Sequence, residues 1–536
     1  MKKIIGITTV LLFTVISVAY LYFSNLNSLT RNNDLILAEI PASAAIILEY
    51  PNDHSLYEIF KDYNLFDTII GKRNKGENSW LKANLLQNNL FEELLNGQKI
   101  ILSLHPSAKD TIDFLWSLPL KDPGNNDKIA EALSKSASNI KIENSGQLLK
   151  ITASELKRPF YLSMSKGIVR GSFSKLILDE CMNGDAKKID KSYVNEISEG
   201  LKKNENALTN LFINYKKPGL LAPFLRRIHP GNLELFNDIS GFSTLSLNFK
   251  SDALMFNGTT SINEKSKSYI NLYLNQSPIK NTLKRIFPYN TANSVTYGVS
   301  SYPLFHKDLI ELFNQRKSTE SLQKQLDLII SESGLNPERD IKKLWGDEMS
   351  TLQLSTHESL AIIKTTDGSK LQFFLEPVSS LYGGQIRKIN YAGIFDYYWG
   401  DPLKKYQKPF FSIIDNLIII SNSANTLKKY LDDYNSSRFL YTADAFIQFD
   451  QLVADQANIS FIFNVRNSDS IIRSLLKKNF ADNFRSNAYG LRDLYAISFQ
   501  LSGNKDRFFT NFYTGYKISK PVEELFFNVD SIIKEN

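Results

Sequence analysis

Cysteine and histidine, the residues that most often build metal and nucleophilic sites, are scarce in this sequence. The single cysteine, Cys181, excludes an intramolecular disulfide and a four-thiolate zinc site. It follows Leu-Ile-Leu-Asp-Glu on an apparent amphipathic helix, where a lone thiol is usually a small buried hydrophobe. The histidines show no pair at metal-ligand helical spacing, so each is expected to be an ordinary core or surface residue: His54, His105, His229, His306 and His357. We therefore predict no metal site and no cofactor.

Sequence motifs of nucleotide, calcium and hydrolase chemistry are missing as well. No Gly-x-Gly-x-x-Gly, P-loop, calcium loop or Gly-x-Ser-x-Gly elbow occurs. Ser-x-x-Lys tetrads, which place lysine near serine in penicillin-recognising enzymes, begin at Ser163, Ser172, Ser321 and Ser474. The Ser-Asp-Asn and Lys-Thr-Gly signatures of those enzymes are absent, so we expect chance matches in a chain rich in serine and lysine.

Carboxylate pairs are the remaining catalytic candidates. Asp432-Asp433 and Glu523-Glu524 fall in helical patterns that predict solvent-facing charge. A glycosidase stays open as an alternative, because its two acids need no fixed sequence spacing. The sequence therefore predicts no specific catalytic residue.

Excess charge of one sign is also small. The 63 basic and 56 acidic residues give a net charge of +7, and the lysines are scattered, so no nucleic-acid partner is predicted. With 536 residues and 43% hydrophobic composition, the chain can fold around more than one core. The 35 phenylalanines and 25 tyrosines favour sheet.

One long uncharged run lies near the start, from Ile4 to Phe23. Its length in a helix, roughly 30 Å, matches the hydrocarbon core of a bilayer. Lys2 and Lys3 precede the run, which predicts a cytoplasmic N-terminus and a body outside the inner membrane. We expect residues 1–23 to be a retained transmembrane signal anchor and residues 24–39 a linker; a cleaved signal peptide is the alternative, with Ser17 and Ala19 before the cut.

Related segments recur at a nearly constant offset in the rest of the chain. The matched pairs lie between 243 and 252 residues apart: Pro41 and Pro288, Gly97 and Gly346, Pro159 and Pro409, Asn214 and Asn464, Ser246 and Ser498, Pro278 and Pro521. The sequence therefore predicts an α+β fold, in which two tandem copies of a module with antiparallel sheet and helices, residues 40–286 and 287–536, follow one transmembrane helix.

Local patterns within the copies predict individual elements. The segments from Lys157 and from Gln407 each read as strand, turn, strand and then a helix opened by Ser or Asn. The segments around Gly97 and Gly346 each read as a helix closed by glycine and followed by a strand. Residues 522–533 have the apolar spacing of a closing helix that covers a sheet.

The basic start, the apolar run and the Pro-led strand entry Ile40-Pro41-Ala42-Ser43-Ala44 resemble N-terminally anchored envelope proteins of Bacteroidetes whose function is unknown. The resemblance implies an envelope location and carries no site residues.

Our leading hypothesis is a non-enzymatic binding or scaffolding protein that meets other envelope proteins. One alternative is a lipid-handling or transport accessory with an apolar ligand, which a continuous apolar groove would favour. Another is an envelope hydrolase, which a pocket with clustered carboxylates, or histidine with serine, would favour.

Overall fold

The computed structural model describes residues 33–52, 72–81, 83–84, 95, 98–106, 112–120, 140–145, 148–216, 220–226, 231–250, 253–263, 265–486 and 491–516. The chain divides into two compact units, which we describe separately: Met1–Lys61 with Lys75–Asn214, and Asp62–Asn74 with Tyr215–Asn536. Residues 33–39, at the end of the expected linker, are helical, and Ile36 and Leu37 are buried in the first unit. The folded body therefore begins before residue 40.

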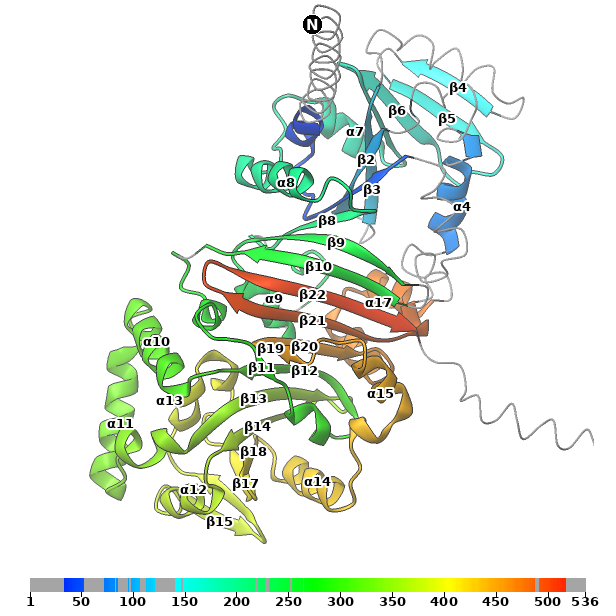
Figure 1. Cartoon of the computed structure of the whole chain (residues 1–536). Coiled ribbons are helices and arrows are strands. Elements are labelled where there is room, and N and C mark those ends of the chain that lie inside the picture. Colours follow the sequence, from blue (N-terminus) through cyan, green and yellow to red (C-terminus); the bar gives the residue numbers. More distant parts are fainter. Residues whose placement is uncertain are drawn as a thin grey trace, which may run out of the picture. The chain divides into compact units, whose positions relative to one another are not determined.

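The described residues of the first unit contain eight strands, all paired antiparallel, in the order β8, β1, β2, β3, β7, β6, β5, β4 (Figure 1). The strands are β1 (Ile46–Pro51), β2 (Lys99–Pro106), β3 (Ile112–Pro119), β4 (Ile140–Ser145), β5 (Leu148–Ala153), β6 (Phe160–Ser165), β7 (Ile168–Ser172) and β8 (Asn210–Asn214). Besides the helical residues 33–39, helices α4 (Lys72–Leu81), α7 (Lys175–Met182) and α8 (Lys191–Lys203) lie in this part of the chain.

The β6–β7 hairpin and α7 follow the local rules read from the sequence. Lys166 and Gly167 both have positive φ, which is the backbone that a two-residue hairpin turn requires. Ser174 then occupies the N-cap position of α7, without a side-chain capping hydrogen bond, and the helix buries Ile177, Leu178 and Cys181. The predicted order of strand, turn, strand and helix is confirmed here, and so is the buried position of Cys181.

Among the described residues of the second unit, twelve strands form a continuous series of antiparallel ladders, in the order β9, β10, β22, β21, β20, β12, β13, β14, β18, β17, β16, β15. They are β9 (Phe242–Lys250), β10 (Ala253–Ser261), β12 (Thr291–Gly298), β13 (Trp345–Leu354), β14 (Ser359–Thr365), β15 (Ser379–Gly383), β16 (Ile386–Ile389), β17 (Phe410–Ile414), β18 (Leu417–Ser421), β20 (Ile459–Asn464), β21 (Leu494–Asn504) and β22 (Arg507–Tyr516). A separate two-stranded pair joins β11 (Ile279–Lys280) to β19 (Gln456–Ala457).

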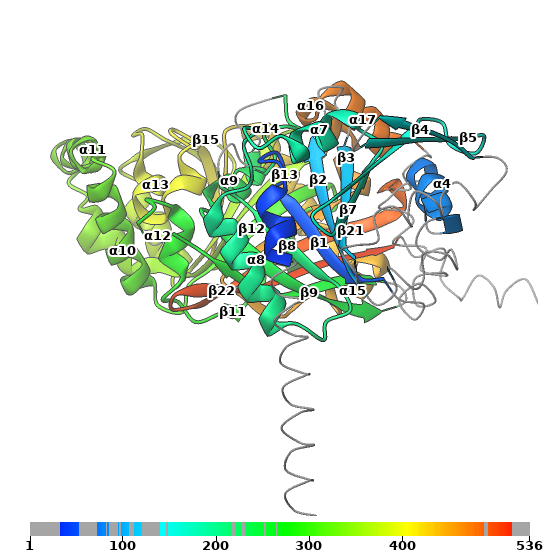
Figure 2. The same cartoon turned by 90° about the horizontal axis from the view of Figure 1, so that it is seen from above.

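Helices of the second unit fill the connections between these strands. The α-helices described there are α9 (Leu235–Asp238), α10 (Tyr302–Gln315), α11 (Thr319–Ser333), α12 (Gly368–Leu375), α13 (Ile394–Trp399), α14 (Ala424–Asn435), α15 (Asp444–Asp450), α16 (Asp469–Leu475) and α17 (Lys478–Arg485). Short helical turns are η3 (Gly231–Glu234), η4 (Tyr269–Tyr273), η5 (Leu283–Ile286), η6 (Pro337–Ile341), η7 (Lys342–Leu344), η8 (Asp401–Leu403), η9 (Leu440–Thr442), η10 (Arg466–Ser468) and η11 (Leu491–Asp493). Figures 1 and 2 both show α10 and α11 side by side, with α13 next to them.

Strand connectivity in residues 291–421 repeats that of residues 46–172. The series β1, β2, β3, β7, β6, β5, β4 has its counterpart in β12, β13, β14, β18, β17, β16, β15. The matched prolines Pro159 and Pro409 each stand directly before the corresponding strand, β6 or β17. The division into residues 40–286 and 287–536 stays a prediction, and its boundary lies inside the second compact unit.

The predicted fold class is wrong. Strands β9 and β10, which were expected to belong to the first module, are part of the antiparallel sheet of the second unit, so the two expected modules do not have sheets of their own. Within the second unit, β10 pairs with β22 along its whole length, from Ala253 opposite Gly515 to Ser261 opposite Arg507. This pairing joins strands on either side of the expected boundary at residue 286. The backbone N–H and C=O groups at the edge of each strand pair with those of the other.

The predicted transmembrane helix has no counterpart in the described part of the chain. None of the helices described there has the length and apolar character of a membrane span. Ile4–Phe23 lies outside the described residues, as do Gly97 and the expected closing helix at 522–533. Gly346 does not close a helix: it is the second residue of β13.

Candidate functional site

The histidines and the cysteine divide by burial. His54 and His229 lie outside the described residues, and His357 is exposed in a turn with positive φ. His105 and His306 are fully buried. Cys181 donates through Sγ to the carbonyl of Glu39 at 3.2 Å, and burial raises the pKa of its thiol, so it is no ready nucleophile.

Serines of the Ser-x-x-Lys tetrads serve the fold. The Ser163 hydroxyl donates to Met182 Sδ at 3.0 Å, the Ser172 hydroxyl to Phe114 O at 2.8 Å and the Ser474 hydroxyl to Ile471 O at 2.9 Å. Ser321 is exposed on α11. No pair of carboxylates emerges from the sequence candidates either. Asp432 is exposed, Asp433 is buried and lies 3.6 Å from Arg438, contrary to its predicted exposure, and Glu523-Glu524 lies outside the described residues.

A pocket of about 560 Å³ lies between α10 and α11 and is completed by η6, η7 and α13. Its volume is within the range of small-molecule sites. The lining residues are His306, Lys307, Asp308, Ile310, Glu311, Phe313, Asn314, Thr319, Leu322, Gln323, Leu326, Glu338, Lys342 and Tyr397. Side chains that are far apart in the sequence therefore meet around one hollow in the second unit.

The walls of the pocket have clear helix boundaries. Ser301 caps α10 by accepting from the amide of Leu304, with Pro303 in the first turn. Gly334, with φ of +68°, ends α11, and Asn336 then caps η6 by accepting from the amide of Arg339 at 3.1 Å. The chain therefore reverses direction after α10 and again after α11, which places η6 and η7 beside α10.

His306 is the unusual member of the lining. Its side chain is 0% exposed, and neither ring nitrogen forms a hydrogen bond within ordinary geometric limits among the described residues. Burial and the nearby Lys342 ammonium lower its pKa to about 4, although Glu338 and the backbone of Tyr397 oppose this shift. The ring is therefore neutral at pH 7.

Tyr397, Glu338 and Lys342 form a hydrogen-bonded chain beside His306. The Tyr397 hydroxyl donates to Glu338, and Lys342 donates to the same carboxylate at 2.8 Å. Burial alone would raise the pKa of Glu338, but these two hydrogen bonds outweigh it and lower the pKa. Burial and Glu338 raise the pKa of Tyr397, so its phenol stays protonated. The Glu338 carboxylate that lines the pocket is therefore ionised and already paired with two hydrogen-bond donors.

Two glycines set the position of α13, which carries Tyr397. The helix begins after Gly393 and ends at Gly400, both with positive φ, and all six of its residues are buried. A Cβ on Gly400 would lie 2.7 Å from the Tyr269 ring and 2.9 Å from Leu309. Both the backbone angle and the space at this helix end therefore require glycine.

Hydrogen bonds tie α13 to the pocket walls. The Tyr398 hydroxyl donates to Pro337 O at 3.0 Å, and the Tyr302 hydroxyl donates to Tyr398 O at 3.0 Å. The first bond holds η6 and the second holds α10. The lining is consequently anchored by groups that lie behind it.

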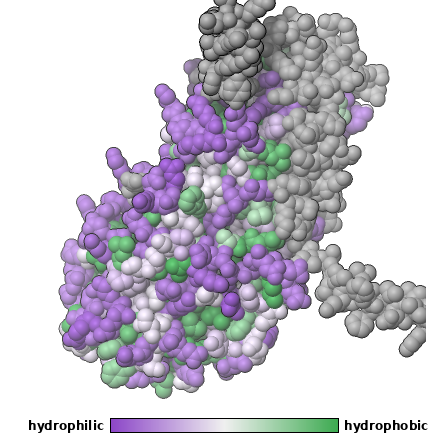
Figure 3. Space-filling model, viewed as in Figure 1, coloured by the Kyte–Doolittle hydropathy of each residue, from purple (hydrophilic) through white to green (hydrophobic). Residues whose placement is uncertain are grey.

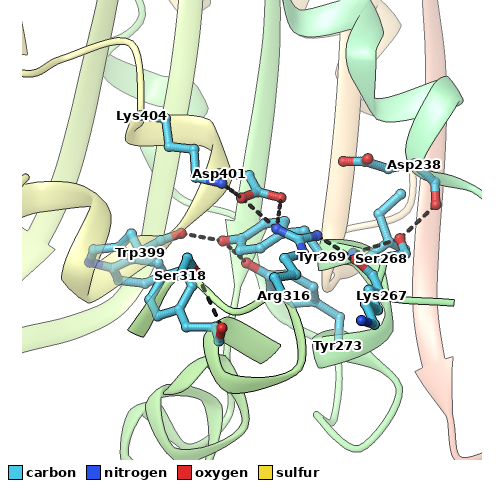
Figure 4. A network of polar contacts seen from close by, with 12 residues as sticks. Asp238, Lys267, Ser268, Tyr269, Tyr273, Arg316, Ser318, Trp399, Asp401 and Lys404 are labelled. Atoms are coloured by element: carbon cyan, nitrogen blue, oxygen red, sulfur yellow. Dashed lines mark hydrogen bonds and ion pairs between the residues drawn. The ribbon is translucent and has the colours of Figure 1, made fainter. Parts of the chain in front are cut away.

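A polar network beyond the end of α10 fixes the residues that follow α13 (Figure 4). Arg316 donates to both carboxylate oxygens of Asp401 at 2.8 and 2.7 Å, and Lys404 lies 2.6 Å from the same group. The Tyr269 hydroxyl donates to Trp399 O at 2.6 Å. These contacts fix the chain on the C-terminal side of Tyr397, so we interpret the network as support for the pocket.

Asp238 lies next to this network and has a strongly shifted pKa. Ser268 donates to its backbone carbonyl at 2.6 Å (Figure 4). Burial raises the pKa of the Asp238 carboxyl to about 7, with further contributions from Asp401 and Glu234. Arg316 and Lys404 act in the opposite direction but do not restore an ordinary value.

A second arrangement of polar groups lies in the first unit. The hydroxyl of the exposed Ser43 lies 2.8 Å from Nδ1 of the buried His105, and the Ser103 hydroxyl lies 2.8 Å from Nε2. Burial lowers the pKa of His105 to about 4, so this ring is also neutral at pH 7. Unlike His306, it has a partner for each nitrogen.

Other site chemistries find less support. Among the described residues, no three side chains of His, Cys, Asp or Glu are grouped to hold a metal ion. On the face drawn in Figure 3, hydrophobic residues of the described chain occur in small separate groups among hydrophilic ones, rather than as a continuous groove. This distribution does not favour the lipid-handling alternative on that face.

Sequence reasoning did not identify the pocket. Glu338 and Tyr397 lie 32 and 91 residues beyond His306, so no fixed spacing reveals them. The ring side chains of Tyr302, His306 and Tyr397-Tyr398 would have indicated a site only if the packing of α10 against α13 had been known. Comparison of the chain with protein-family models, with curated proteins and with solved structures gave no match.

Proposed function

We propose that this protein is a binding protein of the cell envelope, tethered to the inner membrane by Ile4–Phe23, and that it takes a small polar ligand in the pocket between α10 and α11. The observation that carries the proposal is the pocket itself, a hollow of about 560 Å³ in which polar side chains from α10, α11, η6, η7 and α13 meet. Its volume is that of a small-molecule site, and its hydrogen-bonding side chains can fix the orientation of a polar ligand.

The chemistry of the pocket favours binding over catalysis. The His306 ring is a weak base because its pKa is low, and the Glu338 carboxylate is already engaged by Tyr397 and Lys342. A general base works best with a pKa near the working pH, which neither group has. The other hydrogen-bonding side chains of the lining can hold a ligand in a fixed position without any chemistry.

Thermal unfolding in the presence of a library of small polar metabolites tests the proposal. Leu322→Trp places an indole in the pocket, while Lys324→Ala removes an exposed side chain of α11 that pairs with Glu320 at 2.8 Å. At least one compound should raise the Tm of the wild-type chain and of Lys324→Ala but not of Leu322→Trp. Equal shifts in all three proteins, or none in the wild type, would overturn the proposal.

The membrane placement has a test of its own. A reporter that is active only outside the cytoplasm, fused after Asn536, should be active, and the chain should fractionate with inner membranes. An inactive fusion would remove the envelope location. A soluble periplasmic product would replace the retained anchor with a cleaved signal peptide.

A second candidate function, serine hydrolysis, is favoured by the contact between Ser43 and His105. A neutral imidazole within hydrogen-bond reach of an exposed serine is the arrangement of a nucleophile and its base, although a pKa of about 4 makes His105 as weak a base as His306. With a fluorophosphonate probe, a bond would form between Ser43 Oγ and phosphorus, the bond from phosphorus to fluorine would break, fluoride would leave, and the serine proton would pass to His105 Nδ1.

Labelling of the full-length protein separates the two functions. Under serine hydrolysis the probe labels the wild type and Ser321→Ala, which removes another exposed serine, but not Ser43→Ala or His105→Gln. If the wild type is not labelled, the contact between Ser43 and His105 is structural and the hydrolase candidate fails.

A further inference from the structure

Strand β15 (Ser379–Gly383) lies at one end of the sheet of the second unit (Figure 1). It pairs with β16 on one side, and no described residue pairs with its other side. The irregularity in its register falls between Leu381 and Gly383, at the hairpin turn, so the pairing before Leu381 is regular. The unpaired backbone groups of such an edge are a template on which an extended polypeptide adds as a further strand.

The strand at the corresponding place of the first unit, β4, is protected by charge. The Glu143 carboxylate lies 3.5 Å from Lys141 of the same strand and 2.9 Å from Lys150 of β5. Charged side chains on an edge strand are a common means of keeping another strand from adding to it. The sequence of β15, Ser-Ser-Leu-Tyr-Gly, contains no charge. The repeated connectivity therefore ends in one blocked edge and one open edge.

Two large side chains of β15 face the solvent. Leu381 is 67% exposed and Tyr382 is 64% exposed. The Tyr382 ring lies against the Phe410 ring of β17, with centroids 4.9 Å apart, and the Lys388 ammonium lies 5.3 Å from the same Phe410 ring. Leu381 is on the opposite face, because successive residues of a strand alternate. A strand added to β15 would cover apolar surface on both faces.

Charge around this edge is positive. Residues 377–395, which include β15 and β16, contain Arg387 and Lys388 but no Asp or Glu. Arg387 lies 4.0 Å from Glu376, whereas Lys388 forms no ion pair with any described residue. Further exposed lysines without an ion pair in the described part of the chain stand on the adjoining elements: Lys408 before β17, and Lys428 and Lys429 on α14. Electrostatic complementarity therefore favours an acidic partner.

The register of β15 on β16 predicts the residue pattern of that partner. Ser380 stands opposite Lys388, and its side chain is small. A residue that pairs with Ser380 from outside would lie two strand spacings, about 10 Å, from the Lys388 backbone. A glutamate at that position reaches the ammonium group across Ser380. The next residue of the partner points to the other face and meets Leu381.

We infer that β15 is a docking site for an extended segment of another protein, in which acidic and aliphatic residues alternate. The segment adds as one further strand, with its acidic side chains towards Lys388 and its aliphatic side chains towards Leu381. An anionic lipid surface would attract the lysines but could not pair with the backbone of β15. A second copy of this chain would bring a second group of lysines to the same edge. The inference uses no residue of the pocket between α10 and α11.

Fluorescence anisotropy with labelled peptides tests the docking site on the full-length chain in nanodiscs of neutral phosphatidylcholine. The probes are a short peptide of alternating Glu and Val, its Lys-Val counterpart, and a Glu-Val peptide whose central Val is replaced by Pro, which cannot donate to a strand ladder. The Glu-Val peptide should bind with a Kd at least tenfold lower than either of the other two. Equal binding of the three peptides, or none of the Glu-Val peptide, would overturn the inference.

Variants locate the binding. Leu381→Glu places a charge on the exposed edge, as Glu143 does on β4, and should weaken the Glu-Val peptide at least tenfold. Lys388→Ala should weaken it about threefold or more. The matched controls Leu328→Glu and Lys324→Ala, which change an exposed leucine and an exposed lysine of α11, should leave the Kd unchanged. Binding that survives Leu381→Glu would overturn the docking site, and binding that is indifferent to Lys388→Ala would overturn the acidic pattern.

Two further measurements separate the other occupants. Light scattering of the wild type reports a second copy: a dimer that Leu381→Glu converts to a monomer, and that the Glu-Val peptide does not dissociate, would assign the edge to self-association. Co-sedimentation with vesicles that contain phosphatidylglycerol reports a lipid surface. Vesicle binding that is lost in Lys388→Ala and is not displaced by the Glu-Val peptide would assign the lysines to lipid. Either result would overturn the inference.

Discussion

The imidazole of His306 stands edge-on to the phenol ring of Tyr397, with ring centroids 5.1 Å apart and planes at 77°. The hydroxyl of the same tyrosine donates to Glu338. The carboxylate is therefore held by the phenol and by Lys342, which leaves the His306 ring in a setting that favours its neutral form. Burial and the Lys342 ammonium therefore keep this ring uncharged.

Acid should destabilise the protein through His306 and His105. Each has a pKa of about 4 in the folded protein, below its ordinary value of 6.5, so the unfolded chain takes up the proton first. The contribution of each ring is fully present above pH 6.5 and is lost as the pH falls towards 4. We expect a loss of roughly 3 kcal/mol per ring over this window, from 1.36 kcal/mol per pKa unit.

Urea unfolding at pH 7.5 and pH 4.5 checks this expectation in variants of His306. His306→Phe keeps a ring but cannot be protonated, so it should remove its share of the acid-induced loss and leave that of His105. A variant that loses stability with falling pH as steeply as the wild type would show that His306 is already partnered or protonated.

Replacement of Asp238 should have the opposite pH dependence. Its pKa is raised from 3.8 to about 7, so the folded protein holds the proton more tightly than the unfolded chain and loses stability as the pH rises through this window. Asp238→Asn should therefore stabilise the protein at pH 8, on the order of 1–3 kcal/mol, and have little effect at pH 4. The exposed Asp432→Asn is the control, and equal effects of the two variants at pH 8 would contradict the burial of Asp238 as the cause.

Local features of the fold were predictable from the sequence, whereas long-range pairings were not. The turn at Lys166-Gly167 and the N-cap position of Ser174 predict β6, β7 and α7 from neighbouring residues alone. Cys181 is buried, as its position on an apolar stripe predicts. The pairing of β10 with β22 joins residues about 250 positions apart, and nothing in either strand specifies its partner. Gly346 was misread because a glycine after an apolar run suits a helix end as well as a strand.

The pocket is a further case of this limit. His306 has no nearby histidine, cysteine or carboxylate pattern in the sequence, and its setting depends on η6 and α13 reaching α10 through the fold. Its burial without partners is a property of packing, which spacing along the chain does not encode.

The close approach of β10 to β9 gives a test of the sheet. A Cβ on Gly258 would lie 2.1 Å from Thr244 O and 2.9 Å from Leu245 Cα, both backbone atoms that cannot move aside. Gly258→Ala should destabilise the second unit by roughly 2 kcal/mol or more, in the range of overpacked sites. Gly383→Ala, in β15, is the matched control because nothing lies within 4 Å of its Cβ, and similar urea midpoints for the two variants would contradict the register of β9 and β10.

Glu348 supports a second prediction about stability. Its fully buried carboxylate accepts from the amides of Thr282 and Leu283 at 2.8 and 3.0 Å and from the Thr282 hydroxyl at 2.8 Å, and it lies 2.8 Å from Lys364 Nζ. Glu348→Gln turns an acceptor into a donor that faces these N–H groups and leaves Lys364 without its nearer partner, so we expect a cost of roughly 3 kcal/mol.

Chemical denaturation of Asp347→Asn provides the comparison for Glu348→Gln. Asp347 is exposed and lies 3.4 Å from the same lysine, so its replacement should cost less than about 1 kcal/mol. A Glu348→Gln variant as stable as Asp347→Asn would show that the carboxylate does not hold η5 to β13.

The most direct test is a crystal structure of the protein soaked with the compound that gives the largest pocket-dependent shift in Tm. The proposed function predicts ligand density between α10 and α11, with a polar ligand atom within 3.2 Å of at least one polar side chain of the lining. Density only at another site would contradict it.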